Sequence, residues 1–156
     1  MISDATLSPL EVANELRPVL FRLARELRRE TEQLGVTGRQ VTLLWLVKQR
    51  PGLTLTALAE QEGISPPALS GHVDRLQAAG LLVRVRSEID RRRVGLALTP
   101  AGDRLLRRVR ERRTSWLAAR LGTLSPGELA AVEAAVEPLL RILSVKAAPV
   151  PPPVAA

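Results

Sequence analysis

Apolar residues recur at intervals of three and four positions over most of the chain, a spacing that predicts helices. The first such stretch opens with Ser-Pro-Leu-Glu at positions 8–11, a capping box with proline at the first helical position. Its apolar positions continue to Leu27, and Gly35 follows as a stop signal. We therefore expect a long first helix that ends near Gly35. Pro18 should either bend this helix or delay its start.

Three shorter helices are predicted next, because start and stop signals alternate between residues 37 and 80. The second helix begins with a capping box at Thr37 and stops at Pro51-Gly52. Residues 53–62 form a third helix closed by a glycine, and the fourth runs from Ser65 to a stop at Gly80.

The period changes after Gly80. Residues 81–86 and 93–98 read as two short strands joined by a polar turn, which predicts a β-hairpin. Two further helices are expected from 99 to 122 and from 125 to about 143, the second bent by Pro138. Residues 147–156 contain only Ala, Pro and Val, so we expect an extended or disordered tail and assign it no function.

Composition narrows the class of protein. The 156 residues, 46% hydrophobic and 25% charged, fit one folded domain. The net charge of +7 favours a polyanionic partner. The absence of cysteine excludes disulfides, thiolate zinc sites and a cysteine redox switch. With one histidine and no tyrosine, we expect no metal, no cofactor and no enzymatic activity. No apolar run is long enough to span a membrane and no signal sequence is visible, so we expect a cytoplasmic protein.

The third and fourth helices are separated by a tight turn that contains Gly63, which is typical of a helix-turn-helix motif. In that motif the second helix enters the DNA major groove. The hairpin that follows is basic on its strands and in its turn, which makes the predicted motif a winged helix. On the fourth helix, the face expected to be buried carries Leu69, Val73 and Leu76. The face directed toward DNA then carries Pro67, Ser70, Gly71, Asp74 and Ala78.

Several of these residues suit contact with DNA. Ser70 can donate to a phosphate or a base, and Gly71 lets the helix approach the DNA closely. Arg75 can reach a phosphate from the flank of the helix. Ser65 caps the helix, whose free N–H groups also favour a phosphate. Asp74 would repel phosphates, so we expect it to pair with a nearby arginine.

Five segments together resemble the MarR family of bacterial transcriptional regulators. They are residues 37–50, 53–59, 73–76 and 80–82, and the sequence Asp-Arg-Arg-Arg-Val-Gly-Leu-Ala-Leu-Thr-Pro-Ala-Gly at 90–102. The resemblance covers about residues 8–145. It implies a mainly α fold with a small β-hairpin wing. A winged helix-turn-helix at 36–99 would be flanked by N- and C-terminal dimerisation helices at 8–35 and 100–145.

The resemblance also implies a homodimer that binds double-stranded DNA at a palindromic operator. In this family the operator is often released by a small aromatic or phenolic effector. Within the wing, Arg92 would be inserted into the minor groove and Asp90 would position it. Arg91 would contact the DNA backbone or serve as scaffold, and the same two roles are open to Arg84, Arg86 and Arg93. A pocket between the dimer helices and the winged-helix core would have Phe21 and Trp45 as walls. Plain core packing is the alternative role for both aromatics.

We therefore interpret the chain as a sequence-specific DNA-binding transcriptional regulator. A repressor is the favoured role, and an activator is the alternative because the sign of regulation depends on operator position. The rival from another class is a protein-interaction winged-helix module that binds no specific DNA.

Overall fold

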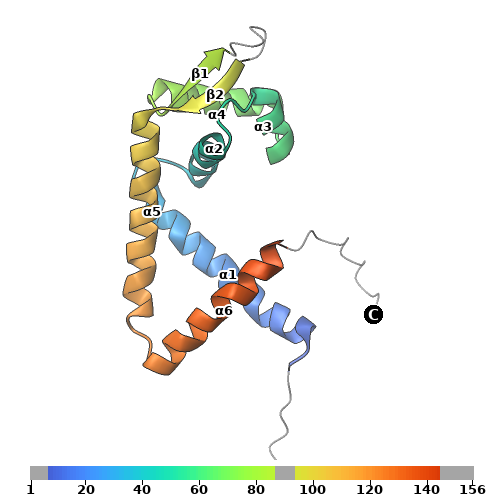
Figure 1. The fold of residues 1–156 in the computed structure, drawn as a ribbon, viewed down its shortest axis with the longest axis vertical. Coiled ribbons are helices and arrows are strands. Elements are labelled where there is room, and N and C mark those ends of the chain that lie inside the picture. The colour runs from blue at the N-terminus through green and yellow to red at the C-terminus, as the bar shows by residue number, and fades with distance from the viewer. Residues whose placement is uncertain (1–6, 87–93, 145–156) are drawn as a thin grey trace, which may run out of the picture. The chain divides into compact units, whose positions relative to one another are not determined.

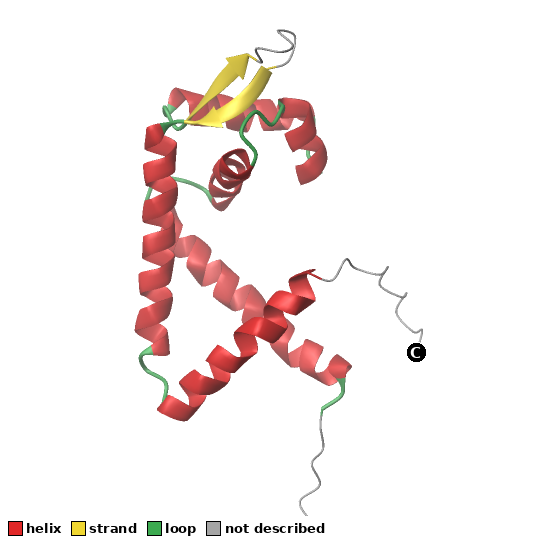
Figure 2. Ribbon diagram, viewed as in Figure 1, coloured by secondary structure: helices red, strands yellow, loops and turns green. Residues whose placement is uncertain are grey.

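The computed structural model describes residues 7–86 and 94–144. These residues form six helices and one hairpin (Figures 1 and 2). In chain order the elements are α1 (Pro9–Glu32), α2 (Gly38–Gln49), α3 (Leu55–Glu62), α4 (Pro66–Ala78), β1 (Leu82–Arg86), β2 (Val94–Leu98), α5 (Pro100–Leu121) and α6 (Pro126–Ser144). The mainly α fold with a small hairpin is therefore as predicted. The chain divides into two compact units after Leu117, within α5.

Side-chain caps set the starts of the helices. Ser8 accepts a hydrogen bond from the Glu11 N–H at 3.3 Å, and the Glu11 carboxylate accepts one from the Ser8 N–H at 2.7 Å. These bonds lower the pKa of Glu11. Thr37 and Gln40 form the same reciprocal pair at the start of α2. The prediction that Pro18 could delay the start of α1 is wrong, because the helix runs from Pro9 through Pro18 to Glu32.

The hairpin pairs β1 with β2 in an antiparallel register that runs from Leu82 opposite Leu98 to Arg86 opposite Val94. The backbone of residues 52–54 also bonds to β2. The N–H of Leu96 donates to the carbonyl of Leu53 and the N–H of Gly52 donates to the carbonyl of Leu96, both at 3.0 Å. The prediction that Leu53 belongs to the third helix is therefore wrong. Its backbone pairs with β2, and α3 begins only after the cap at Thr54.

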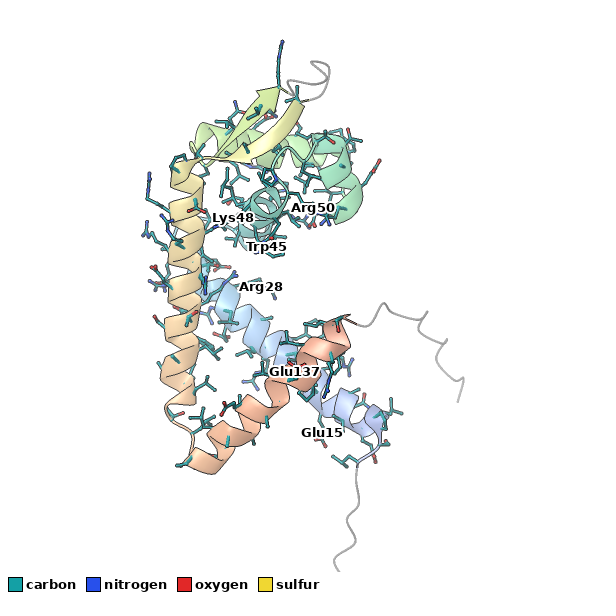
Figure 3. All side chains as sticks on the ribbon, in the orientation of Figure 1. Glu15, Arg28, Trp45, Lys48, Arg50 and Glu137 are labelled. Carbon is teal, nitrogen blue, oxygen red and sulfur yellow. The ribbon has the colours of Figure 1, made fainter. Side chains whose placement is uncertain are left out.

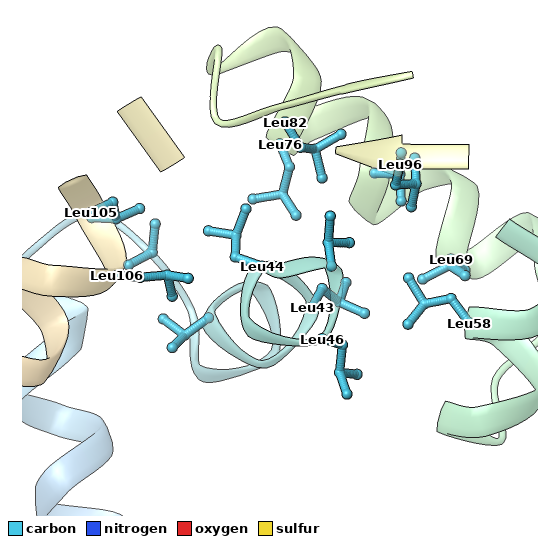
Figure 4. Close-up of a cluster of buried hydrophobic side chains, with 14 of the residues drawn as sticks. Leu43, Leu44, Leu46, Leu58, Leu69, Leu76, Leu82, Leu96, Leu105 and Leu106 are labelled. Carbon is cyan, nitrogen blue, oxygen red and sulfur yellow. The ribbon is translucent and has the colours of Figure 1, made fainter. Parts of the chain in front are cut away.

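The hydrophobic core belongs to the winged helix-turn-helix and to the start of α5. Leucines from α2, α3, α4, both strands and α5 gather around α2 (Figure 4). Those with no exposed surface are Leu43, Leu44, Leu58, Leu69, Leu76 and Leu82. By contrast, α1 buries only Thr31 and α6 buries no residue. The core thus packs both α4 and the hairpin against α2.

None of the helices in residues 7–86 and 94–144 combines the length and the apolar character that a membrane span requires.

Candidate nucleic-acid interface

The turn between α3 and α4 has the geometry of a helix-turn-helix. Gly63 ends α3 in the left-handed region, with φ 61° and ψ 31°, a conformation that glycine adopts without strain. Ser65 then caps α4 by accepting a hydrogen bond from the Ala68 N–H at 3.4 Å. The predicted inward residues Leu69, Val73 and Leu76 are completely buried. The opposite face of α4 is therefore open, as the sequence predicted.

The predicted DNA-facing residues lie along this open face. Ser65 and Pro67 are exposed at the start of α4, and Ser70 and Gly71 are half-buried one turn later. A Cβ added at Gly71 would meet no atom within 4 Å. The helix backbone at Gly71 can therefore come close to a ligand that approaches from solvent.

Arg75 lies on the flank of α4, where it is exposed. One of its terminal nitrogens is 3.2 Å from Nδ1 of His72. His72 is half-buried and one helical turn away, so this contact orients the guanidinium along the helix. Arg75 remains accessible to an anion.

Asp74 is paired, as the sequence predicted. Its Oδ1 lies 2.6 Å from Nη2 of Arg84, which comes from β1. The other terminal nitrogen of Arg84 donates to Oε1 of Gln77 at 2.5 Å. The first strand of the hairpin is thereby joined to the candidate recognition helix through one guanidinium.

The tip of the wing lies outside the described residues. This segment includes Asp90, Arg91 and Arg92, so their assigned roles stay predictions. The described part of the wing carries two further exposed features. Arg86 ends β1 with no described partner, and Val83 and Val85 are 42% and 47% exposed on the face opposite Arg84.

Two glycines of the quoted 90–102 sequence are required by close packing. A Cβ at Gly95 would lie 2.6 Å from the backbone oxygen of Gly52, and a Cβ at Gly102 would overlap the carbonyl oxygen of Leu81. Between them, Thr99 donates to the carbonyl of Gly80 at 2.6 Å and accepts from the Gly102 N–H at 3.0 Å. Sequence reasoning missed these roles, although glycine within a strand or helix does signal close approach.

A cavity of about 590 Å³ lies between α2 and α5. Trp45 lines it and is 52% exposed, alongside Lys48 from the same helix (Figure 3). Apolar residues from both helices complete the wall, including Val41, Leu106 and Val109. Of the two aromatics predicted to form a pocket, the structure places only Trp45 here. Phe21 is 68% exposed on α1 and does not line the cavity.

The rim of this cavity is basic. Lys48 and Arg107 share the carboxylate of Asp103, at 2.6 Å and 2.7 Å. The hydrogen bond from Lys48 is the largest cause that lowers the pKa of Asp103. Arg110 has no partner among the described residues. Burial, followed by the positive charge of Arg28, lowers the pKa of Arg113. Sequence reasoning did not predict that arginines of α5 line this cavity.

Arg112 and Arg113 of α5 also contact α1 within the same chain. Arg112 lies 3.3 Å from the carboxylate of Glu30, and it also donates to Gln33. Arg113 donates to the backbone carbonyl of Leu27 at 3.3 Å. These contacts hold the C-terminal part of α1 against α5.

The remainder of α1 exposes large apolar side chains: Leu10, Val12, Val19, Leu20 and Phe21. Taken by itself, α6 does the same with Leu129, Val132, Val136, Leu140, Ile142 and Leu143. On each helix taken by itself, this many exposed large apolar side chains is uncommon on the surface of a monomer.

Histidine and acidic side chains within residues 7–86 and 94–144 form no cluster suited to a metal ion.

Comparison with known proteins gives a consistent result. The family model described as MarR family matches residues 36–94. An HTH-type transcriptional regulator from Bacillus subtilis, YfiV, is 32% identical over 114 residues, covering 73% of this chain and 71% of its own. The HTH-type transcriptional repressor MdtR from the same organism is 28% identical and covers 81% of each chain. A solved structure of a MarR family protein from Bacillus stearothermophilus is 25% identical with a TM-score of 0.71, covering 86% of this chain and 94% of that one.

Proposed function

Because this chain belongs to the MarR family, we propose that it is a DNA-binding transcriptional regulator that acts as a homodimer on a palindromic operator. The observation that carries the proposal is the open face of α4. This face is free of the core, begins at a capped helix N-terminus, and lies beside a basic strand of the hairpin. These are the features by which a recognition helix enters a major groove.

A homodimer is supported by the exposed apolar faces of α1 and α6. We propose that residues 8–35 and 100–145 pair with a second copy of the chain, while residues 36–99 bind DNA. A two-fold dimer would then place its recognition helices in two major grooves about one helical turn, or roughly 34 Å, apart. Repression is the favoured direction of control, since the relative MdtR is a repressor by name.

Each α4 would contact its half-site through Ser65, Pro67, Ser70, Gly71 and Arg75. We propose that Arg91 and Arg92 extend the contact from the wing, with Arg92 in the minor groove and Asp90 positioning it. The polar side chains on α4 are few, so much of the affinity should come from phosphate contacts and DNA shape.

The cavity between α2 and α5 is the candidate effector site. Its wall combines an indole with aliphatic side chains, and its rim carries Lys48, Arg110 and Arg113. Such a site suits a small aromatic anion, because the ring packs on Trp45 while the cations hold the charged group. A ligand that prefers one arrangement of the dimer would shift the protein away from the DNA-binding state.

A mobility-shift titration tests the function. The probe is any inverted repeat in the DNA beside the gene, compared with a scrambled duplex of equal length. We expect a clear preference for the repeat. If a dimer neutralises roughly eight phosphates, log K should fall with log salt at a slope of about −7.

Arg92→Ala should weaken operator binding by about 1–3 kcal/mol without unfolding the protein. If wild-type protein bound the inverted repeat and the scrambled duplex equally, the alternative of a protein-interaction module without specific DNA binding would be favoured.

A further inference from the structure

Arg84 holds two side chains of α4 at once. Its Nη2 lies 2.6 Å from Oδ1 of Asp74, and its Nη1 lies 2.5 Å from Oε1 of Gln77. Positions 74 and 77 are one helical turn apart, so a single planar guanidinium can span both. Arg84 stands opposite Leu96 in the hairpin register, and Leu96 is buried in the core. The side chain of Arg84 is therefore directed toward α4.

Because Asp74 is negatively charged, its ion pair with Arg84 matters for the binding of an anionic partner such as DNA. The Asp74 side chain is 59% exposed on the open face of α4, whereas that of Arg84 is 32% exposed. An uncompensated carboxylate on this face would stand against the phosphates of a bound duplex, and like charges across an interface are costly. Among the described residues, Arg84 is the only ion-pair partner of Asp74.

The same guanidinium restrains Gln77. A glutamine side chain can read adenine by donating to N7 and accepting from N6 at the same time. In this structure the carbonyl oxygen of Gln77 already accepts a charge-assisted bond from Arg84. To read adenine in that way, Gln77 would have to share this oxygen between Arg84 and the base, or release Arg84.

On the premise of the proposed DNA-binding function, we propose that Arg84 is a positioning residue that sets both operator affinity and base preference. It neutralises Asp74 and restrains Gln77, and it makes no contact with DNA itself. The recognition helix then reads its site without an amide contact to adenine, through the residues left free around Gly71.

Charge-matched variants test the first half of the proposal. Arg84→Met alone leaves Asp74 uncompensated and should weaken binding to the operator at least tenfold. The pair Asp74→Asn with Arg84→Met restores the net charge of wild type, and its affinity should return to within about threefold. Its salt slope should equal that of wild type, because no phosphate contact is lost.

The competing role, a direct phosphate contact by Arg84, gives different results. The double variant would then bind as weakly as Arg84→Met, and the salt slope would fall by about 0.9 for each lost contact. Either result overturns the proposal. Wild-type protein titrated on the same duplex separates this failure from failure of the proposed function, which would abolish the wild-type preference as well.

Base selection from a randomised half-site tests the second half. Wild type and Gln77→Ala should select the same bases, because Gln77 is held away from them. The Asp74→Asn, Arg84→Met protein should gain an adenine preference that the added Gln77→Ala change removes. A preference that differs between wild type and Gln77→Ala would contradict the restraint.

Thermal unfolding of each variant checks that it is folded. If Arg84→Met does not fold, Arg84→Lys retains the charge beside Asp74 without the planar fork. It should keep wild-type affinity and salt slope but acquire the adenine preference of released Gln77. A base preference identical to that of wild type in the lysine variant would contradict the restraint of Gln77.

Discussion

Gly102, in the first turn of α5, packs directly against the backbone carbonyl of Leu81, and a Cβ at this position would overlap that oxygen. A Cβ would also lie 3.1 Å from Cγ of Leu98. The N–H of Gly102 meanwhile donates to Thr99, which bonds back to Gly80. Together these contacts join the end of α4 and the start of the hairpin to the first turn of α5.

Gly102→Ala should therefore be destabilising. The added methyl group cannot be accommodated without moving the backbone at Leu81, and overpacking of this kind costs about 1–3 kcal/mol. Urea unfolding followed by circular dichroism measures the loss. Gly127→Ala on α6 is the matched control, because a Cβ there meets nothing within 4 Å. If Gly102→Ala were as stable as this control, the packing contact would be disproved.

Gly71→Ala should change the stability of the protein and its affinity for DNA in opposite directions. Alanine favours the interior of α4 by up to about 1 kcal/mol over glycine, and the added Cβ meets no described atom. Stability should rise slightly. Operator affinity should fall by about fivefold, equivalent to about 1 kcal/mol, since the methyl group lies on the face proposed to approach the DNA. Affinity unchanged in the mobility-shift titration would remove Gly71 from the interface.

The stability of the protein should depend on Asp103 in acid. Lys48 lowers the pKa of Asp103 below its usual value of 3.8. Its favourable contribution is therefore complete above that value and is lost as the pH falls through the lowered pKa of the folded state. Asp103→Asn should be less stable than wild type at pH 7, and the difference should shrink between about pH 5 and pH 2. Urea unfolding at several pH values measures this, and a difference independent of pH would contradict it.

A charge on the exposed apolar faces should dissociate the proposed dimer. Phe21→Asp on α1 and Leu140→Asp on α6 each place a carboxylate on such a face. Burial of an unpaired charge is costly enough to prevent association. Sedimentation should show a monomer that still unfolds cooperatively but binds the operator weakly. Thr56→Asp in the first turn of α3 adds the same charge away from these faces and should leave the assembly unchanged.

The proposal that the cavity between α2 and α5 binds an effector can be tested through the fluorescence of Trp45. In a Trp116→Phe protein, Trp45 is the remaining tryptophan. Benzoate should alter its emission and release the operator, because the ring would pack on the indole. Arg110→Gln should weaken both effects by removing a cation from the rim. Benzyl alcohol, which lacks the charge, is the control ligand. Equal responses to both ligands would mean that the basic rim does not select an anion.

The sequence by itself determined the helices, their caps, the turn at Gly63 and the inward face of α4. These features depend on residues three or four positions apart, whose types can be read directly from the chain. It also predicted that Asp74 needs a cationic partner. The family could also be identified from the sequence, because the segment that resembles it most specifically, residues 90–102, is continuous in the chain.

Tertiary structure decided what depends on residues distant along the chain. Leu53 lies outside α3, and its backbone carbonyl accepts a hydrogen bond from the N–H of Leu96 in β2. Lys48 meets Asp103 across 55 positions, so no local pattern could place that pair in a cavity beside Trp45. Spacing gave no reason to choose Arg84 over the other arginines of the wing as the partner of Asp74. The choice follows from the hairpin register, which directs Arg84 toward α4 and leaves it within reach of both Asp74 and Gln77.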